Sequence, residues 1–280
     1  MDDPWRRLTY LAIVLPAYLP LLAAAVPGWR RYRRRYLAGW PDWLPAMMIV
    51  AALMAVVDAF SVAQGWWVFD QRYFTPPIVA GVPFAELLFF AGAVFFIRFI
   101  IVWVDGFARR VGVSGRVASR RRLLMVAGAL TVAGYGFAWF NAAHPRTVVE
   151  FGFMSVLSTL LLAATPAFWR RETWVGIGVA LGLLFVMDSV MNHLRTFIHT
   201  AGVGTGITVF GLFPLEDIPY ALTVIQLLIA APHLWRQAKA HSRADGSGGS
   251  AESQAGDGST GAQAGDGPTG AQPDPAEAGG

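Results

Sequence analysis

The sequence predicts an all-α fold, a polytopic membrane bundle of about seven transmembrane helices. Hydrophobic residues make up 55% of the chain and charged residues 14%, against about 25% charged residues in a typical soluble protein. The apolar residues also gather in long runs, each close to the roughly 20 residues that a helix needs to cross a bilayer. Arginine-rich loops separate several of these runs, a pattern typical of proteins that positive charge orients in a membrane.

The predicted spans, in chain order, cover residues 9–27, 43–63, 79–104, 123–141, 149–168, 174–192 and 206–235. The first run leads directly into Trp29 and a dense arginine cluster. We therefore expect it to be retained as a helix.

Basic residues are distributed unevenly between the predicted loops. The loops after the first, third and fifth spans and the segment after the seventh hold most of the arginines, among them Arg33, Arg121, Arg170 and Arg236. Because positively charged loops stay in the cytoplasm, this bias predicts a multi-pass protein of the cell membrane with its N-terminus outside and its C-terminus in the cytoplasm. Arg98 lies inside the third span, near its cytoplasmic end, where its side chain can reach the interface.

Two stretches of the chain share a pattern of acids and prolines. Asp58 precedes by 25 residues a Pro-Phe-Ala-Glu tetrad that begins at Pro83, and Asp188 precedes by 26 residues a Pro-Leu-Glu-Asp tetrad that begins at Pro214. A glycine comes shortly before each tetrad. The pattern predicts an internal repeat in which the sixth and seventh helices correspond to the second and third.

The repeat suggests three parts of the chain. Residues 1–122 form a first repeat of three helices, residues 123–243 a joining helix and the second repeat, and residues 244–280 a tail. The tail contains the near-repeat AGDGSTGAQ and AGDGPTGAQ and lacks large apolar residues. Such a composition cannot bury enough surface to offset the entropy lost on ordering, so we expect a disordered tail.

Several chemistries are excluded by what the chain lacks. It has no cysteine, which removes disulfides, thiolate metal sites and cysteine nucleophiles. The five histidines have no metal-ligand spacing, and neither GxGxxG nor GxxxxGK[ST] follows a strand. We therefore expect no metal and no nucleotide cofactor. The basic pI near 9.8 reflects arginines in short loops, which favours membrane orientation over nucleic-acid binding.

The acidic residues within or beside the predicted spans include Asp58, Glu86, Asp188, Glu216 and Asp217. An ionisable group at membrane depth costs about 2.5–3.5 kcal/mol, and the predicted topology places all five at one level, toward the outer leaflet. One interpretation is a functional site. The other is that they are solvated at the interface and cap the helices that begin after Pro83 and Pro214. Their common level favours the site.

The spacing around the second tetrad indicates acid chemistry. Tyr220 lies four residues after Glu216 and three after Asp217, so its phenol can reach either carboxyl group on a helix. Two neighbouring carboxyl groups in a low dielectric do not both ionise readily, so one holds its proton and can act as a general acid. Among aromatic rings such an acid could protonate an alkene, and the rings would stabilise the resulting cation.

At these residues the sequence resembles the integral-membrane lycopene cyclase family of the heterodimer type, found as paired subunits or as a fusion. The resemblance covers about residues 8–236. The residues that carry it are Asp58, Trp67–Tyr73 and Gly81–Phe90 in the first half and Asn192–Thr196, Thr205–Ile207 and Pro214–Tyr220 in the second.

The resemblance implies a carotenoid cyclase without a cofactor. Such enzymes protonate the terminal double bond of a linear carotene, close a six-membered ring through a tertiary cation and lose a proton, with no net redox change. The expected partners are a lipophilic carotene and the lipid bilayer, with neighbouring carotenoid-pathway enzymes or a second copy of the chain as further candidates. The ring type and the length of the substrate stay open.

The resemblance also implies roles for individual residues. The signature acids of the family are the third and fourth residues of each tetrad. On this basis Glu216 is the leading acid, Asp217 is its partner, and Glu86 supports them from the other half. The first tetrad departs from the pattern, because Ala85 replaces its leading acid. The supporting residues are expected to be Asp58 and Asp188, which either relay protons or hold the catalytic acids in place, Tyr220, and Asn192 as a hydrogen-bonding partner or a helix cap.

Three other functions share some of these sequence features. A transporter or proton channel also uses intramembrane carboxylates, but a relay needs acids at several depths rather than at one. A seven-helix retinal protein needs a lysine within a helix, and the single lysine, Lys239, follows the last span. A carotenoid hydratase would form the same cation and capture water, so ring closure and water capture both stay open.

Overall fold

The computed structural model describes residues 4–74, 76–112, 115–116 and 119–252. The contacts divide the chain into two units, Met1–Ala238 and Lys239–Gly280, and the fold below is that of the first unit. The repeat boundary expected after residue 122 falls inside this unit and stays a prediction. Most of the tail expected to be disordered, residues 253–280, lies outside the described residues. Residues 244–252 of it belong to the last helix.

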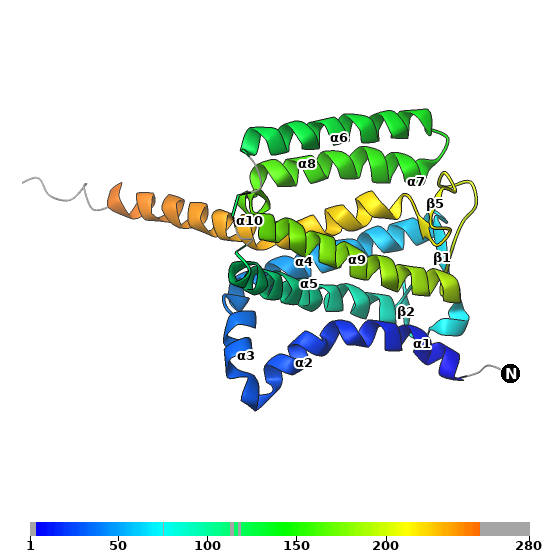
Figure 1. The fold of residues 1–280 in the computed structure, drawn as a ribbon, viewed down its shortest axis with the longest axis horizontal. Coiled ribbons are helices and arrows are strands. Elements are labelled where there is room, and N and C mark those ends of the chain that lie inside the picture. Colours follow the sequence, from blue (N-terminus) through cyan, green and yellow to red (C-terminus); the bar gives the residue numbers. More distant parts are fainter. Residues whose placement is uncertain (1–3, 75, 113–114, 117–118, 253–280) are drawn as a thin grey trace, which may run out of the picture. The chain divides into compact units, whose positions relative to one another are not determined.

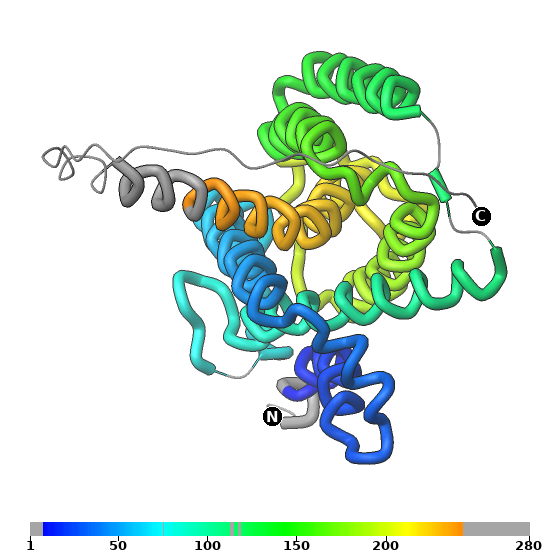
Figure 2. Tube along the Cα trace, turned by 90° about the vertical axis from the view of Figure 1, so that its left-hand side faces the viewer, coloured from blue at the N-terminus to red at the C-terminus, as the bar shows by residue number. Residues whose placement is uncertain are grey.

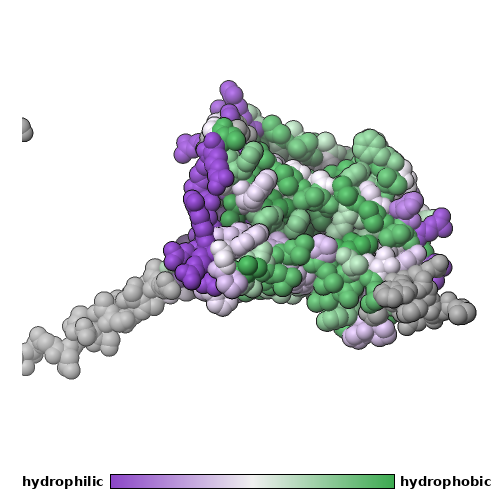
Figure 3. Space-filling view, turned by 60° about the horizontal axis from the view of Figure 1, so that its bottom comes forward, coloured by the Kyte–Doolittle hydropathy of each residue, from purple (hydrophilic) through white to green (hydrophobic). Residues whose placement is uncertain are grey.

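The predicted all-α class is confirmed (Figure 1). Seven segments of the described chain are long and apolar enough to cross a membrane: Leu8–Ala25, Trp40–Ala63, Phe84–Arg110, Arg120–Phe140, Pro145–Ala164, Arg171–Leu194 and Asp217–Ser242. Large apolar side chains are exposed along them, including Trp139 at 78% and Phe140 at 88% of their full area. Figure 3 shows these apolar surfaces and a hydrophilic band at one end. These features are those of a multi-pass membrane protein.

The first segment is broken by prolines. It consists of α1 (Pro4–Val14), the 3₁₀ turn η1 (Leu15–Tyr18) and α2 (Leu19–Ala25), with Pro16 and Pro20 at the starts of the second and third pieces. Proline lacks the N–H that an uninterrupted helix needs. The short pieces η2 (Pro27–Trp29) and α3 (Arg30–Tyr36) then carry the first arginine cluster.

Longer helices form the body of the bundle. They are α4 (Trp40–Ala63), α5 (Phe84–Arg110), α6 (Arg120–Phe140), α7 (Pro145–Thr147), the π-helical η4 (Val148–Phe153), α8 (Met154–Ala164), η5 (Pro166–Trp169), α9 (Arg171–Leu194) and α10 (Asp217–Glu252). Helix α5 packs against both α4 and α9, while α6 packs against α8 and η4. Figure 2 shows α6 lying outermost, beyond α8. The main apolar cluster joins residues of α4, α5, α8, α9 and α10.

Three short two-stranded ribbons connect the helices. They are β1 (Trp67–Phe69) with β4 (Phe197–His199), β2 (Ile78–Val79) with β3 (Val82–Pro83), and β5 (Thr208–Val209) with β6 (Phe213–Pro214). The β2–β3 and β5–β6 ribbons correct the sequence prediction, which began the third span at residue 79 and the seventh at residue 206. Gly81 and Gly211 have φ angles of 83° and 71°, and these left-handed turns close hairpins that precede the helices.

The ribbon of β1 and β4 brings the two halves of the chain together. Trp67 pairs with His199 and Phe69 with Phe197. Because side chains alternate along a strand, these four residues share one face and line a cavity in the bundle, while the intervening Val68 is exposed. Each half has the same order of helix, strand, hairpin and helix. The internal repeat itself stays a prediction.

Candidate active site among the transmembrane helices

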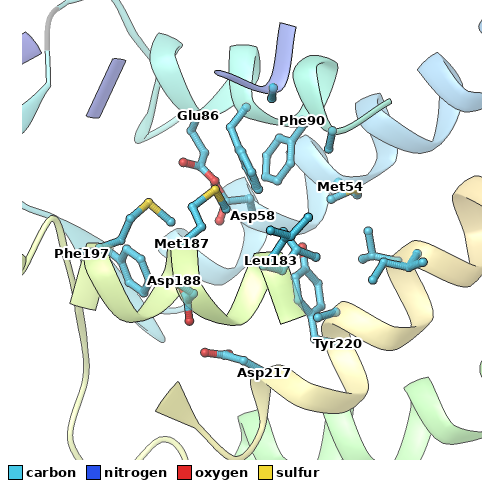
Figure 4. Close-up of a pocket in the computed structure, with 18 of the residues that line it drawn as sticks. Met54, Asp58, Glu86, Phe90, Leu183, Met187, Asp188, Phe197, Asp217 and Tyr220 are labelled. Carbon is cyan, nitrogen blue, oxygen red and sulfur yellow. The ribbon is translucent and has the colours of Figure 1, made fainter. Parts of the chain in front are cut away.

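A cavity of about 320 Å³ lies inside the bundle. Its wall is formed mainly by apolar side chains from the first segment, from α4, α5, α9 and α10 and from β4, among them Met54, Phe90, Leu183, Met187 and Phe197. Five carboxyl groups also line it, those of Asp58, Glu86, Glu150, Asp188 and Asp217. Figure 4 shows four of these acids around this space, each from a different helix: Asp58 of α4, Glu86 of α5, Asp188 of α9 and Asp217 of α10. The volume is at the lower end of the range for small-molecule pockets.

Asp58 and Glu86 are the two acids with few polar contacts. Asp58 is 4% exposed, and its Oδ1 accepts a hydrogen bond of 3.0 Å from Nε1 of Trp67. Its Oδ2 is buried and has no hydrogen-bond partner among the described residues. Glu86, in the first turn of α5, is 7% exposed, and its Oε2 is likewise buried without a partner in the described structure.

Asp188 lies near both Glu86 and a buried arginine. Its charge would repel that of Glu86 and attract that of Arg146. Asn192, one helical turn further along α9, donates a hydrogen bond of 3.3 Å from Nδ2 to Oδ2 of Asp188. The side chain of Asn192 therefore contacts an acid of the cavity, and its role in the proposed chemistry stays a prediction.

Arg146 of α7 organises the polar end of the cavity. It is 3% exposed, and its Nε donates to Oε1 of Glu150 over 2.9 Å. Its Nη2 donates to Oδ1 of Asp217, and its Nη1 donates over 2.6 Å to Nδ1 of His199. The guanidinium carbon lies 5.3 Å from the ring centre of Trp67. Two carboxylates therefore share one buried cation.

His199 is neutral in this arrangement. An arginine can only donate, so Nδ1 of His199 accepts and the ring proton is on Nε2, which lies 3.9 Å from Oδ2 of Asp217. Burial, followed by the nearby charge of Arg146, lowers the pKa of His199 from 6.5 to about 3. The contact with Asp217 is therefore that of an uncharged ring, not an ion pair.

Glu216 is placed differently from the expected leading acid. It is 1% exposed but does not line the cavity. Its Oε1 accepts three hydrogen bonds, from Oγ1 of Thr147 at 2.8 Å and from the backbone N and Oγ1 of Thr205 at 2.7 and 2.8 Å. Burial raises the pKa of Glu216, but the hydrogen bonds outweigh it, and the net pKa lies below the ordinary 4.5. The geometry makes Glu216 a carboxylate that anchors the loop around Thr205.

The position of Tyr220 also differs from the expectation. Its phenol forms no hydrogen bond with either tetrad acid in the part of the chain that the structure describes. It lines the cavity, where its electrostatic neighbours include Asp58, Glu86 and Glu150. Because Glu216 precedes the first residue of α10, the helical spacing that would bring its side chain to Tyr220 does not apply.

The prolines set where each tetrad enters its helix. Pro83 is the N-cap residue of α5, whereas Pro214 ends β6 and two further residues precede α10. In both tetrads the fourth residue, Glu86 or Asp217, lines the cavity. The third residue does not, and Ala85 packs instead into an apolar cluster with Tyr10 and Met191. The replacement at 85 therefore removes no acid from the cavity.

The structure brings together four of the five predicted acids and adds three residues that the sequence reasoning missed, Arg146, Glu150 and His199. Arg146 lies between two predicted spans, so the cost of a charge inside the membrane did not point to it. Glu150 lies at the edge of the predicted fifth span, four residues after Arg146, and this i, i+4 spacing of opposite charges was the available signal. His199 had no local signal, because its contact with Arg146 depends on the pairing of β1 with β4.

Comparison with protein-family models, with curated proteins and with solved structures finds no match for this chain. Within the described residues, no group of three or more His, Asp or Glu side chains could hold a metal ion. Two acids without a countercharge and two paired with Arg146 face one apolar space, an arrangement that can both give and accept a proton.

Proposed function

We propose that the chain is a lycopene-cyclase-type enzyme, which closes a ring at the end of a linear carotene without redox chemistry. The observation that carries the proposal is the cavity, in which Glu86 and Asp58 face aromatic and aliphatic side chains within the membrane helices. A carboxyl group buried without a countercharge favours its neutral form. A neutral acid beside an apolar substrate is what protonation of an alkene requires.

Glu86 is the proposed proton donor. Its Oε2 has no hydrogen-bond partner among the described groups, so its proton is not committed to another protein atom. In the first step this proton forms a C–H bond with the terminal double bond and leaves a tertiary cation. A second double bond attacks the cation and closes the ring, moving the positive charge into the ring. Phe89, Phe90 and Phe96 line the cavity and would stabilise that charge through their ring faces.

Asp217 is the proposed acceptor of the proton that leaves the ring. Its ion pair with Arg146 keeps it ionised, and it lines the same cavity as Glu86. Loss of a ring proton to Asp217 creates the final double bond. Asp188 is near both Glu86 and Arg146, so it is the natural relay for returning the proton to Glu86. Protons and electrons then balance over the cycle.

The proposed substrate enters from the lipid. The size of the cavity, about 320 Å³, suits one end of a long hydrocarbon, with the rest of the molecule in the bilayer. The same cation could instead capture water, as in a hydratase. The apolar wall favours ring closure, because it excludes water, the nucleophile that would otherwise capture the cation.

We also propose that the arginine-rich end of the bundle faces the cytoplasm, which leaves the N-terminus outside. Contacts at this end include an isolated antiparallel β-bridge between the backbones of Arg116 and Arg170, and the ion pair of Arg170 with Asp105. Arginines from several predicted loops thus meet at one end of the helices, as a single orientation requires.

Expression in a lycopene-accumulating bacterium tests the function. Conversion of the red linear pigment to cyclic carotenes, resolved by chromatography and mass, supports the proposal. Hydroxylated linear products would assign a hydratase instead. Unchanged lycopene, with the protein verified in the membrane fraction, would count against both enzymes and leave the transporter as the next function to examine.

A further inference from the structure

A second cavity, of about 640 Å³, lies at the arginine-rich end of the bundle. It is formed where α3 meets α4, along the last turns of α5, at the start of α9 and near Arg236 of α10. Its charged lining consists of five arginines, Arg35, Arg98, Arg109, Arg170 and Arg236, and three acids, Asp42, Asp105 and Glu172. The lining therefore carries an excess of positive charge.

Among the described residues, Arg98 forms no ion pair with these three acids. This arginine is half-buried, and its Nε and Nη2 donate hydrogen bonds of 3.2 and 3.0 Å to the backbone oxygens of Tyr36 and Ala38. Its guanidinium carbon lies 5.3 Å from the ring centre of Trp43. Carbonyl groups and an aromatic ring hold the guanidinium in place without neutralising its full charge.

Other arginines of the cavity converge on the same space. Arg236 donates to the backbone oxygen of Pro232 over 3.1 Å, and its charge repels that of Arg98. The guanidinium of Arg35 lies over Gly106, where an added Cβ would stand 3.5 Å from both of its terminal nitrogens. In contrast, Asp105 is engaged by Arg109 and Arg170. Like charges held close together cost energy, which a bound anion would offset.

We infer that this cavity binds a phosphate group, carried by an anionic phospholipid of the adjoining leaflet. Guanidinium groups match the geometry of phosphate oxygens, and basic pockets between transmembrane helices are suited to such headgroups. Met47, Ile101 and Ile229 also line the cavity, so an acyl chain could lie against the apolar part while the headgroup meets the arginines. This site is separate from the proposed catalysis.

The alternative is that these arginines only orient the chain in the membrane. Orientation depends on the total charge of a loop, so neighbouring arginines on α3 would be equivalent. A binding site instead distinguishes arginines that line the cavity from those that do not. Arg35 lines it and Arg34, one residue earlier on the same helix, does not.

Lipid binding by the purified full-length protein in a neutral detergent tests the inference, with native mass spectrometry and thermal stability as readouts. The lipid probes are phosphatidylglycerol and phosphatidylcholine, and the soluble probes are inorganic phosphate and glycerol phosphate. We expect preferential binding of phosphatidylglycerol and a higher melting temperature. Arg35→Gln and Arg236→Gln should each weaken that binding about fivefold, and Arg34→Gln should leave it unchanged.

Each outcome decides the inference. Equal binding of the two lipids without an effect of soluble phosphate would overturn it, as would equal weakening by Arg34→Gln and Arg35→Gln. Stabilisation by inorganic phosphate or glycerol phosphate that matches phosphatidylglycerol, and is lost in Arg236→Gln, would keep the phosphate site and assign a soluble ligand to it. The comparison of lipids on the wild-type protein does not depend on whether the variants fold.

Discussion

Glu216 and Asp217 are neighbours in the chain, yet only Asp217 lines the cavity. Three hydrogen bonds hold Glu216 to Thr147 and Thr205, whereas Asp217 meets Arg146. In the second tetrad, Glu216 therefore stabilises the fold and Asp217 places its carboxylate at the cavity. In the first tetrad the corresponding residues are Ala85, packed in an apolar cluster, and Glu86 in the cavity.

Removing the proton of Glu86 should stop the proposed reaction. Glu86→Gln keeps the shape of the side chain, but an amide does not donate a proton to an alkene. We expect conversion of lycopene to fall by a factor of about 100 or more while the protein still accumulates, measured as cyclic pigment per unit of membrane protein. Asp70→Asn, a similar change at an acid paired with exposed Arg72, should keep normal conversion. A Glu86→Gln protein with near-normal conversion would remove Glu86 from the donor role.

Changing Glu216 should affect stability more than chemistry. Glu216→Gln removes the charge from the acceptor of three hydrogen bonds, and charge-assisted hydrogen bonds are each worth about 1.5–3 kcal/mol. We expect a lower melting temperature in detergent but retained conversion per folded molecule. Complete loss of conversion in a protein of normal stability would return Glu216 to the role of the leading acid.

Acidification should destabilise the fold through His199. The pKa of His199 is about 3 in the folded protein and near 6.5 in an unfolded chain, so the unfolded state binds more protons between these values. The contribution of His199 to stability is therefore full above pH 6.5 and falls as the pH drops below it. Glu216, with a pKa below 4.5, adds to this loss only at lower pH.

Melting temperatures between pH 7 and pH 5 measure this effect. His199→Gln should flatten the pH dependence in that range, and the same substitution at exposed His241 should not. An unchanged slope in His199→Gln would show that the ring is not held neutral by burial beside Arg146.

The close contact between α6 and α8 should be sensitive to a single methyl group. A Cβ at Gly134 would lie 2.5 Å from Oγ of Ser155 and 2.9 Å from the backbone oxygen of Phe151. Gly134→Ala should therefore destabilise the protein by about 1–3 kcal/mol. Gly136, on the same helix, has nothing within 4 Å of an added Cβ, so Gly136→Ala is the matched control and should be neutral or stabilising. Equal melting temperatures for the two variants would contradict the observed contact.

The proposed orientation can be tested with reporters that work on one side of the membrane only. A fluorescent protein fused after Ala238 should fluoresce, because it would lie in the cytoplasm. Alkaline phosphatase fused at the same place should be inactive, because it folds into an active enzyme only outside the cytoplasm. The opposite result would invert the topology and place the phosphate cavity at the outer leaflet.

The helices were predictable because each span must be apolar over its whole length, a property of local sequence alone. The starts of the third and seventh spans were not, since the hairpins that close at Gly81 and Gly211 also consist of apolar residues. In a membrane protein, apolar composition does not separate a short hairpin from the first turn of a helix.

The candidate site was predictable only in part. The cost of acids in a membrane identified Asp58, Glu86, Asp188 and Asp217, which all line the cavity. The partner of Asp217, however, is Arg146, 71 residues away in the chain. Such a pairing follows from how helices and ribbons come together, and no local spacing records it. For the same reason the sequence could not tell that Glu216 faces two threonines.

The origin of the new ring hydrogen tests the central claim most directly. Purified protein, equilibrated in D₂O and mixed with lycopene in detergent, should yield a cyclic carotene that carries deuterium in each ring closed, and Glu86→Gln should yield none. Cyclic product of natural isotopic mass, or lycopene recovered unchanged after incubation with folded protein, would contradict proton-initiated cyclisation in this cavity.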